Sequence, residues 1–220
     1  MAIARKLAYN VIFNSVLKVT STVVLSLLLV RLITGYLGQE GFGKYATVLA
    51  FFSFFAAISD LGLGPVTARE IAKDGSDEGK ILGNVVALRL VSSALLITIA
   101  PLVVLFFDYP VEVKWGIIIV ACASFFSSLS LVMNGVFQKR IAMDRVAMVE
   151  FIGKLIQVSL IACIVKFNLG FFPIVLSVLV ALAFNVTTVY LISRQFIRFS
   201  LRFDIAFWKA FLKESLPMGA

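Results

Sequence analysis

Six ionisable side chains interrupt apolar segments of this sequence, and they are the residues best placed to do chemistry. They are Lys18, Arg31, Asp60, Arg89, Glu150 and Lys154. A cation held away from water binds an anion such as a phosphate group, and a carboxylate in the same surroundings neutralises a cation. Arg31 lies near the end of its apolar segment, where a long side chain reaches water. The other five predict either ion pairs or a binding site inside the apolar layer.

The composition identifies that apolar layer as a membrane. Hydrophobic residues make up 61% of the 220 residues and charged residues 15%, whereas a soluble domain averages about 45–50% apolar and about 25% charged residues. The 21 Phe residues could not all be buried in a soluble core of this size. The net charge of +8 is concentrated beside the apolar segments, which indicates membrane lipids as the partner and disfavours nucleic acid.

Six segments are long and apolar enough for a helix to cross a bilayer, which takes about 20 residues. We predict spans over roughly 10–33, 45–66, 81–107, 115–137, 147–167 and 172–193. Gly35, Gly38, Gly41 and Gly43 lie between the first two spans and predict a tight turn, because together they disfavour one continuous helix. Strands are disfavoured because the apolar runs are long and do not alternate. The predicted fold class is an all-α membrane protein, a bundle of six transmembrane helices.

The sequence predicts a division of the chain after residue 193. Residues 1–193 are expected to form the six-span bundle, and residues 194–220 an amphipathic segment in the cytoplasm. Asp204 is expected to cap a short helix whose apolar side chains meet lipid and whose lysines meet phosphates. These side chains are Phe207, Trp208, Phe211 and Leu212 for lipid, and Lys209 and Lys213 for phosphates. Residues 215–220 resemble the start of a seventh span, so we expect the chain to be truncated.

Positive charge in the predicted connections is strongly one-sided. On the side of the N-terminus lie Arg5, Lys6, Arg69, Lys73, Lys80, Lys139, Arg140, Arg145, Arg194, Arg198, Arg202, Lys209 and Lys213. On the opposite side lie only Lys44, Lys114 and Lys166. Because cytoplasmic connections carry the excess of Lys and Arg, both termini are predicted to be cytoplasmic.

Four of the buried charges are predicted to share one depth. Lys18, Asp60, Arg89 and Lys154 each lie roughly 9–13 Å from the cytoplasmic boundary of an apolar layer about 30 Å thick. One interpretation is a polar chamber open to the cytoplasm, with Glu150 and Lys154 paired along one helix face. Its surplus of positive charge would suit a lipid phosphate or pyrophosphate. The alternative is that Asp60 neutralises one cation and the other cations reach the interface.

Metal, cofactor and enzyme chemistry are not expected from this sequence. Cys122 and Cys163 lie in apolar segments without CxxC spacing, and the chain contains no His, so both cysteines are interpreted as small buried hydrophobic residues. The sequence has no phosphate-binding loop, dinucleotide-binding, zinc-protease or hydrolase motif. The connections are also too short to form a soluble catalytic domain.

The residues around the glycine turn resemble a known family. The pattern is Arg31-Leu32-x-x-x-Tyr36-Leu37-Gly38-x-x-Gly41-Phe42-Gly43-x-Tyr45, followed by Asp60-Leu61-Gly62-Leu63 and Arg69-Glu70-Ile71-Ala72. It is similar to the N-terminal half of Wzx-type polysaccharide biosynthesis flippases, the O-antigen and teichuronic acid exporters of the multidrug/oligosaccharidyl-lipid/polysaccharide exporter superfamily. The resemblance covers essentially the whole chain.

The resemblance implies a flippase in the cytoplasmic (inner) membrane of a bacterium or archaeon. Such a protein moves an oligosaccharide linked to a polyprenyl (pyro)phosphate by alternating access between two helical bundles, of which this chain resembles the first. A second six-helix half or another copy of the chain, and polysaccharide-assembly enzymes, would then be its partners. The sugar, the coupling ion and the oligomeric state are left open.

The resemblance also implies roles for the buried charges. Lys18, Arg89 and Lys154 become candidates for binding the phosphates of the lipid carrier, and Asp60 and Glu150 become candidates for structural pairing or for coupling to Na⁺ or H⁺. A cation-coupled antiporter of the same superfamily, similar to multidrug and toxin extrusion proteins, is the first alternative, although it would favour an acidic chamber. A membrane scaffold without transport activity is the second alternative.

Overall fold

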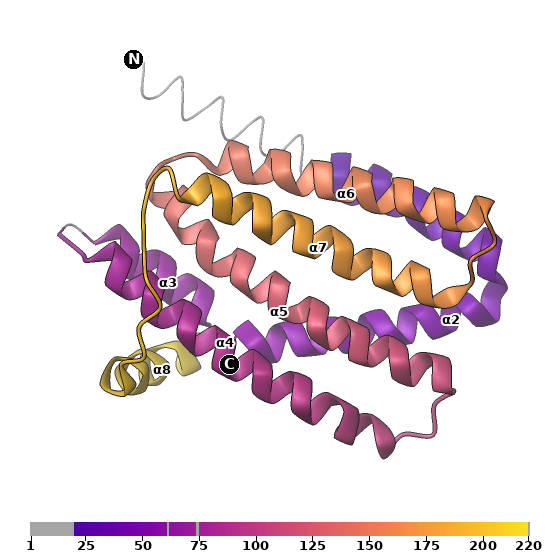
Figure 1. Cartoon of the computed structure of the whole chain (residues 1–220), viewed down its shortest axis with the longest axis horizontal. Helices are drawn as coiled ribbons and strands as arrows, with labels where there is room; N and C mark the ends of the chain where they lie inside the picture. Colours follow the sequence, from indigo (N-terminus) through magenta and orange to yellow (C-terminus); the bar gives the residue numbers. More distant parts are fainter. Residues whose placement is uncertain (1–19, 61, 74, 220) are drawn as a thin grey trace.

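The computed structural model describes residues 20–60, 62–73 and 75–219, and these ranges fold into helices without a strand. The elements in order are η1 (Thr20–Leu25), α2 (Ser26–Asp60), α3 (Leu63–Ala72), α4 (Glu78–Leu105), α5 (Val111–Lys139), α6 (Met143–Lys166), α7 (Phe171–Ser193) and α8 (Ile205–Gly219). The long helices lie roughly side by side, with α3 and α8 gathered at one end of the bundle (Figure 1). The predicted all-α fold class is confirmed.

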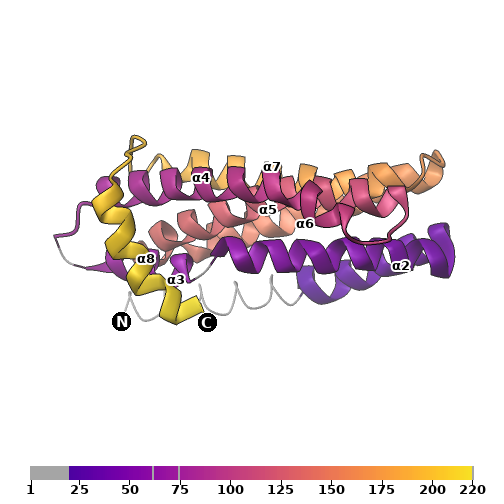
Figure 2. The same cartoon turned by 90° about the horizontal axis from the view of Figure 1, so that it is seen from below.

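Five helical segments in the described residues are long and apolar enough to cross a membrane. They are Val23–Asp60, Glu78–Leu105, Val111–Lys139, Met143–Lys166 and Phe171–Ser193. The first covers residues 23–33 of the first predicted span and 45–60 of the second, because α2 doubles back on itself in a sharp bend (Figures 1 and 2). The last four predicted spans coincide closely with α4, α5, α6 and α7.

The bend in α2 is tighter than the sequence predicted. Gly38 alone leaves the helical conformation, with φ 69° and ψ −174°. This backbone region is open essentially only to glycine, so one residue reverses the chain. Gly35, Gly41 and Gly43 stay helical, and the interpretation that they disrupt the helix is wrong for these three positions. Glycine is common in membrane helices, where lipid offers the backbone no competing hydrogen-bond partner.

The second predicted span, 45–66, is wrong at its C-terminal boundary. The helix ends at Asp60, and Gly62 then adopts a left-handed conformation with φ 73° before α3 begins at Leu63. The Asp60 Oδ1 atom accepts a hydrogen bond of 3.2 Å from the Gly64 amide. A helix N-terminus leaves several amides without partners, so Asp60 satisfies one of them and fixes the change of direction between α2 and α3.

Helix α5 lies at the centre of the bundle and packs against α2, α3, α4 and α7. Small residues allow these close approaches. A Cβ atom at Gly116 would lie 2.7 Å from Val48 Cγ2 on α2, and one at Gly135 would lie 3.2 Å from the Ala68 Cα atom on α3. Small residues at helix contacts are typical of membrane bundles, where packing replaces the hydrophobic effect.

Helix α8 packs on the bundle itself. The Asp204 cap is confirmed, since its Oδ1 atom accepts a hydrogen bond of 3.0 Å from the Phe207 amide. Phe211 is buried, and Phe207, Trp208 and Leu212 pack against the same cluster of apolar side chains from α3, α4 and α5. The expectation that this apolar face meets lipid is therefore wrong. The sequence shows the amphipathic face of α8 but not the apolar surface of α3 and α4 that it covers.

Candidate functional site

Arg89 and Asp60 form an ion pair between α4 and α2. The Arg89 Nη2 atom lies 2.6 Å from Asp60 Oδ1, and Nη1 donates a hydrogen bond to the Ser59 carbonyl oxygen. The Arg89 side chain is 0% exposed and the Asp60 side chain 29% exposed. A guanidinium group without accessible surface offers no site for a phosphate in this conformation. The contacts of Arg89 are those of a structural partner of the α2 C-terminus.

A second group of polar side chains lines a cavity of about 320 Å³ between α2, α6 and α7. Its polar lining consists of Tyr45 and Ser53 from α2, Glu150, Lys154 and Gln157 from α6, and Asn185 from α7. We call this cavity the Lys154 pocket. Glu150 and Lys154 both line this pocket, and no ion pair of the Lys154 amine is found within residues 20–60, 62–73 and 75–219.

Helical spacing explains how α6 supplies its share of the Lys154 pocket. Glu150, Gly153, Lys154 and Gln157 follow the three- and four-residue spacing that places side chains on one face of a helix. A Cβ atom at Gly153 would overlap the Asn185 Oδ1 atom, so glycine at this position allows α7 to bring its amide against α6. The Asn185 Oδ1 atom is buried and accepts no hydrogen bond from the described residues.

Arg89 and Lys154 are not brought together. The prediction of one chamber lined by both is wrong for Arg89, which is fully buried against Asp60 and lies outside the lining of the Lys154 pocket. The reason is geometric, because depth along a helix axis does not specify the direction of a side chain around that axis. Glu150 and Lys154 do share one pocket. Lys18 lies outside the described residues.

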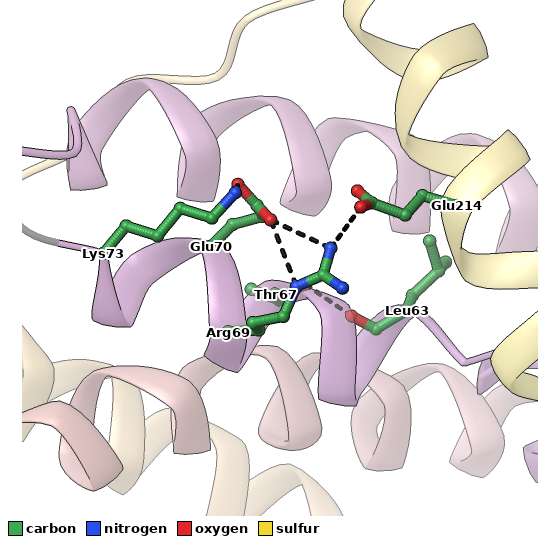
Figure 3. Close-up of polar contacts among 6 residues, drawn as sticks. All are labelled: Leu63, Thr67, Arg69, Glu70, Lys73 and Glu214. Carbon is green, nitrogen blue, oxygen red and sulfur yellow. Dashed lines mark hydrogen bonds and ion pairs between the residues drawn. The ribbon is translucent and has the colours of Figure 1, made fainter.

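A third polar group, which the sequence analysis did not single out, links α3 to α8 (Figure 3). Arg69 pairs with Glu70 at 3.0 Å and also with Glu214 of α8, and Lys73 pairs with Glu70 at 2.7 Å. The hydrogen bond from Lys73 is the main cause that lowers the pKa of Glu70 from its ordinary value. The three-residue spacing of Glu70 and Lys73 indicates their ion pair in the sequence. The sequence does not indicate that Glu214 of α8 pairs with Arg69.

Two ion pairs and a hydrogen bond also join the ends of α3, α4 and α5. Lys139 of α5 lies 2.8 Å from Glu78 of α4 and donates a hydrogen bond to the carbonyl oxygen of Ile71 in α3. Arg140 lies 3.1 Å from the same Glu78. The described part of the chain contains no cluster of three or more His, Cys, Asp or Glu side chains that could hold a metal ion. The contacts of Lys139 and Arg140 join the ends of α3, α4 and α5 at the α3–α8 end of the bundle.

Comparison with known families identifies the family of the chain. A family model described as polysaccharide biosynthesis protein matches residues 7–220. The chain belongs to this family. As a polysaccharide biosynthesis protein with several membrane-crossing helices, it is a multi-pass membrane protein. No curated protein and no solved structure matches it.

Proposed function

We propose that this polysaccharide biosynthesis protein is a flippase for polyprenyl-(pyro)phosphate-linked oligosaccharides. The observation that carries the proposal is the Lys154 pocket, where an amine that has no carboxylate partner among the described residues lies beside hydroxyl and amide groups and near Glu150. A lipid-linked oligosaccharide combines an acidic phosphate with sugar hydroxyls, and both match this lining. Membership of the polysaccharide biosynthesis protein family supports the same substrate class.

The position of Lys154 supports a transport role. It follows the first residue of α6, Met143, by eleven positions, roughly 17 Å along the helix at 1.5 Å per residue. This is more than the roughly 9–13 Å expected from the sequence because α6 begins before residue 147, and it puts Lys154 near the middle of a layer about 30 Å thick. A charged side chain at this depth costs at least about 2.5–3.5 kcal/mol. A phosphate bound beside the amine would offset that cost. Transporters hold their substrates at this level and alternate access around them.

The mechanism follows from these positions. Lys154 would hold the phosphate, while Tyr45, Gln157 and Asn185 would hydrogen-bond to the first sugars and the prenyl chain would stay in lipid. Lys18 remains a further candidate cation. The Arg89–Asp60 pair would keep α2 and α4 together during rocking of the bundle. A second six-helix half or another copy would close the other side of the substrate path, and assembly enzymes would supply the substrate.

The test uses variants encoded at the native locus of a cell that displays the polysaccharide. Lys154→Ala is expected to reduce surface polysaccharide at least tenfold and to cause the lipid-linked oligosaccharide to accumulate on the cytoplasmic side. Lys154→Arg keeps the cation and is therefore expected to retain most of the activity. Lys166→Ala, at the end of the same helix and outside the pocket, is the matched control. Normal polysaccharide in Lys154→Ala cells with normal protein levels would refute the proposal.

Glu150 gives a second candidate function some support, because it places a carboxylate in the same pocket. A cation-coupled antiporter requires such a group to bind Na⁺ or H⁺. In that case, efflux of a cationic dye would depend on a Na⁺ or proton gradient and would be lost in Glu150→Gln, while surface polysaccharide would stay normal. A scaffold without transport activity would show neither phenotype.

A further inference from the structure

We propose that the protein has a separate binding site for one anionic phospholipid of the bilayer. It is formed by residues 194–204, which we call the α7–α8 connection, and by the groove beneath it between α4, α5 and α7. This site differs from the Lys154 pocket in position and lining, and the inference does not depend on the transport reaction.

The α7–α8 connection is fixed to the bundle by its backbone. The Arg202 amide donates a hydrogen bond of 3.3 Å to the Gly83 carbonyl oxygen, and the Asp204 amide donates one of 3.0 Å to Asn84 Oδ1. A Cβ atom at Gly83 would overlap the Ser200 carbonyl oxygen, so the connection rests directly on the α4 backbone. Figure 1 shows it running from the end of α7 across the ends of α5 and α4 to α8. A fixed backbone presents its side chains in a defined arrangement.

The groove beneath the connection is mainly apolar and has a volume of about 370 Å³. It is lined by Val86 and Leu90 of α4, Leu129 and Met133 of α5, Val186, Thr187 and Tyr190 of α7, and Phe199 and Leu201 of the connection. The rings of Tyr190 and Phe199 meet edge to face at its margin, with centroids 6.1 Å apart. Thr187 and Tyr190 are exposed, so the groove opens on the side of the bundle, where an acyl chain can enter it.

Unpaired positive charge lies beside this groove. Arg194, Arg198 and Arg202 are exposed, and within the described ranges none of their side chains forms an ion pair or a hydrogen bond. This contrasts with Arg69, Arg89 and Arg140, which all have carboxylate partners. Because the span formed by α7 ends at Ser193, the connection lies at the boundary of the apolar layer, at the level of the lipid headgroups.

The charge of the α7–α8 connection and its level in the membrane together favour a phospholipid as the ligand. A phospholipid carries its phosphate at the membrane boundary and its acyl chains directly below, which matches cations on the connection above an apolar groove. Arginine also binds phosphate through paired hydrogen bonds. The three arginines of the connection are opposed only by Asp204 within it, and that carboxylate caps α8. An anionic headgroup is therefore favoured over a zwitterionic one.

Native mass spectrometry of the purified full chain in detergent can test this site by titration with phosphatidylglycerol and with phosphatidylcholine carrying the same acyl chains. One phosphatidylglycerol is expected to bind with preference over phosphatidylcholine. The Arg198→Gln/Arg202→Gln variant is expected to weaken phosphatidylglycerol binding about thirtyfold, since each cation contributes about a fivefold effect at a membrane surface. Thr187 is exposed and lines the groove. The larger side chain of Thr187→Phe would fill the groove, so this variant is expected to weaken binding of both lipids at least fivefold.

The matched control is Lys209→Gln/Lys213→Gln, which removes the same charge from exposed positions of α8. It is expected to leave phosphatidylglycerol binding within twofold of the unaltered chain. An equal loss in both double variants would show diffuse surface attraction and would refute the site. Unchanged binding in Thr187→Phe, or equally tight binding of glycerol phosphate without acyl chains, would refute the role of the groove and with it the proposal.

Discussion

Arg89 is fully buried on α4, whereas 29% of the Asp60 side chain is exposed at the end of α2. The two partners therefore differ in what they lose when the other is removed. Without Asp60, Arg89 would remain as a charge inside the bundle with no carboxylate partner. Without Arg89, Asp60 could still be hydrated from its exposed side and could still accept the hydrogen bond from the Gly64 amide.

This asymmetry predicts that Asp60→Asn destabilises the protein more than Arg89→Met. Asparagine keeps an oxygen that can accept the hydrogen bond from the Gly64 amide, but it leaves Arg89 without a counter-charge. Breaking a buried ion pair in this way costs about 3–5 kcal/mol. Arg89→Met removes the buried charge itself, so its cost is smaller. Thermal unfolding in detergent measures both. Equal melting temperatures for the two variants would contradict the proposed asymmetry.

Glu70 makes the stability of the α3–α8 contact depend on pH. Its pKa in the folded protein is lowered, first by the hydrogen bond from Lys73 and also by Arg69. A lowered carboxylate pKa contributes stability that is present above the unfolded pKa and is lost as the pH falls through the folded pKa. We expect the melting temperature to fall on acidification below the ordinary Glu pKa of 4.5, by the equivalent of at most about 1 kcal/mol because the ion pairs are partly exposed.

Glu70→Gln is the control for this pH effect. It removes the titrating group and keeps a side chain of nearly the same size. The variant should lose part of its stability at neutral pH and show a smaller additional loss on acidification than the unaltered chain. Identical pH profiles for both proteins would assign the acid sensitivity to other carboxylates.

Among the helices, α2 gives the clearest test of how one residue shapes an element. A Cβ atom at Gly38 would meet nothing within 4 Å, so the requirement for glycine is conformational. We expect Gly38→Ala to cost about 1–3 kcal/mol, the strain of holding a side chain in this backbone region. Gly43→Ala is the matched control, since Gly43 is helical and equally open, and it should be neutral or stabilising by up to about 1 kcal/mol. Denaturation of both variants in detergent tests the difference.

The sequence predicted the existence of the long helices well because a span of about 20 apolar residues needs no information about its neighbours. It did not predict where α2 ends, because Leu61 and Leu63 continue the apolar pattern while Gly62 and Asp60 terminate the helix. The environment of α8 was also missed. Lipid and a protein core are equally apolar, so an amphipathic pattern alone cannot distinguish between them.

At the scale of the whole molecule, the charged connections predict which face lies in the cytoplasm. We expect the α3–α8 end of the bundle to be cytoplasmic and the Asp108 connection to be outside, because Lys and Arg are concentrated at the former. In a background with Cys122→Ala and Cys163→Ala, a membrane-impermeant maleimide added to intact cells should label Asp108→Cys and not Lys209→Cys. Both positions are exposed. Labelling of the Lys209→Cys protein alone would reverse the predicted orientation.

The candidate site shows the same limit on sequence reasoning for the molecule as a whole. Glu150 and Lys154 were predicted to share one face because they lie on one helix, and they do line one pocket. Arg89 was assigned to the same chamber from depth alone, and the arrangement of helices around α5 places it against Asp60 instead. The contribution of Asn185 depends on the approach of α7 at Gly153, which no single-helix pattern reveals.

The close contact between Ser200 and Gly83 implies an order in which the parts of the chain assemble during biosynthesis. Residues 194–204 leave the ribosome after α4 and α7, and they can rest on the α4 backbone only once both helices are adjacent in the bilayer. Docking of α8 is therefore a late step that follows membrane insertion of the helices before it. Until that step, the apolar surface of α3 and α4 that receives Trp208 and Phe211 stays uncovered, so a nascent chain halted before residue 194 exposes it.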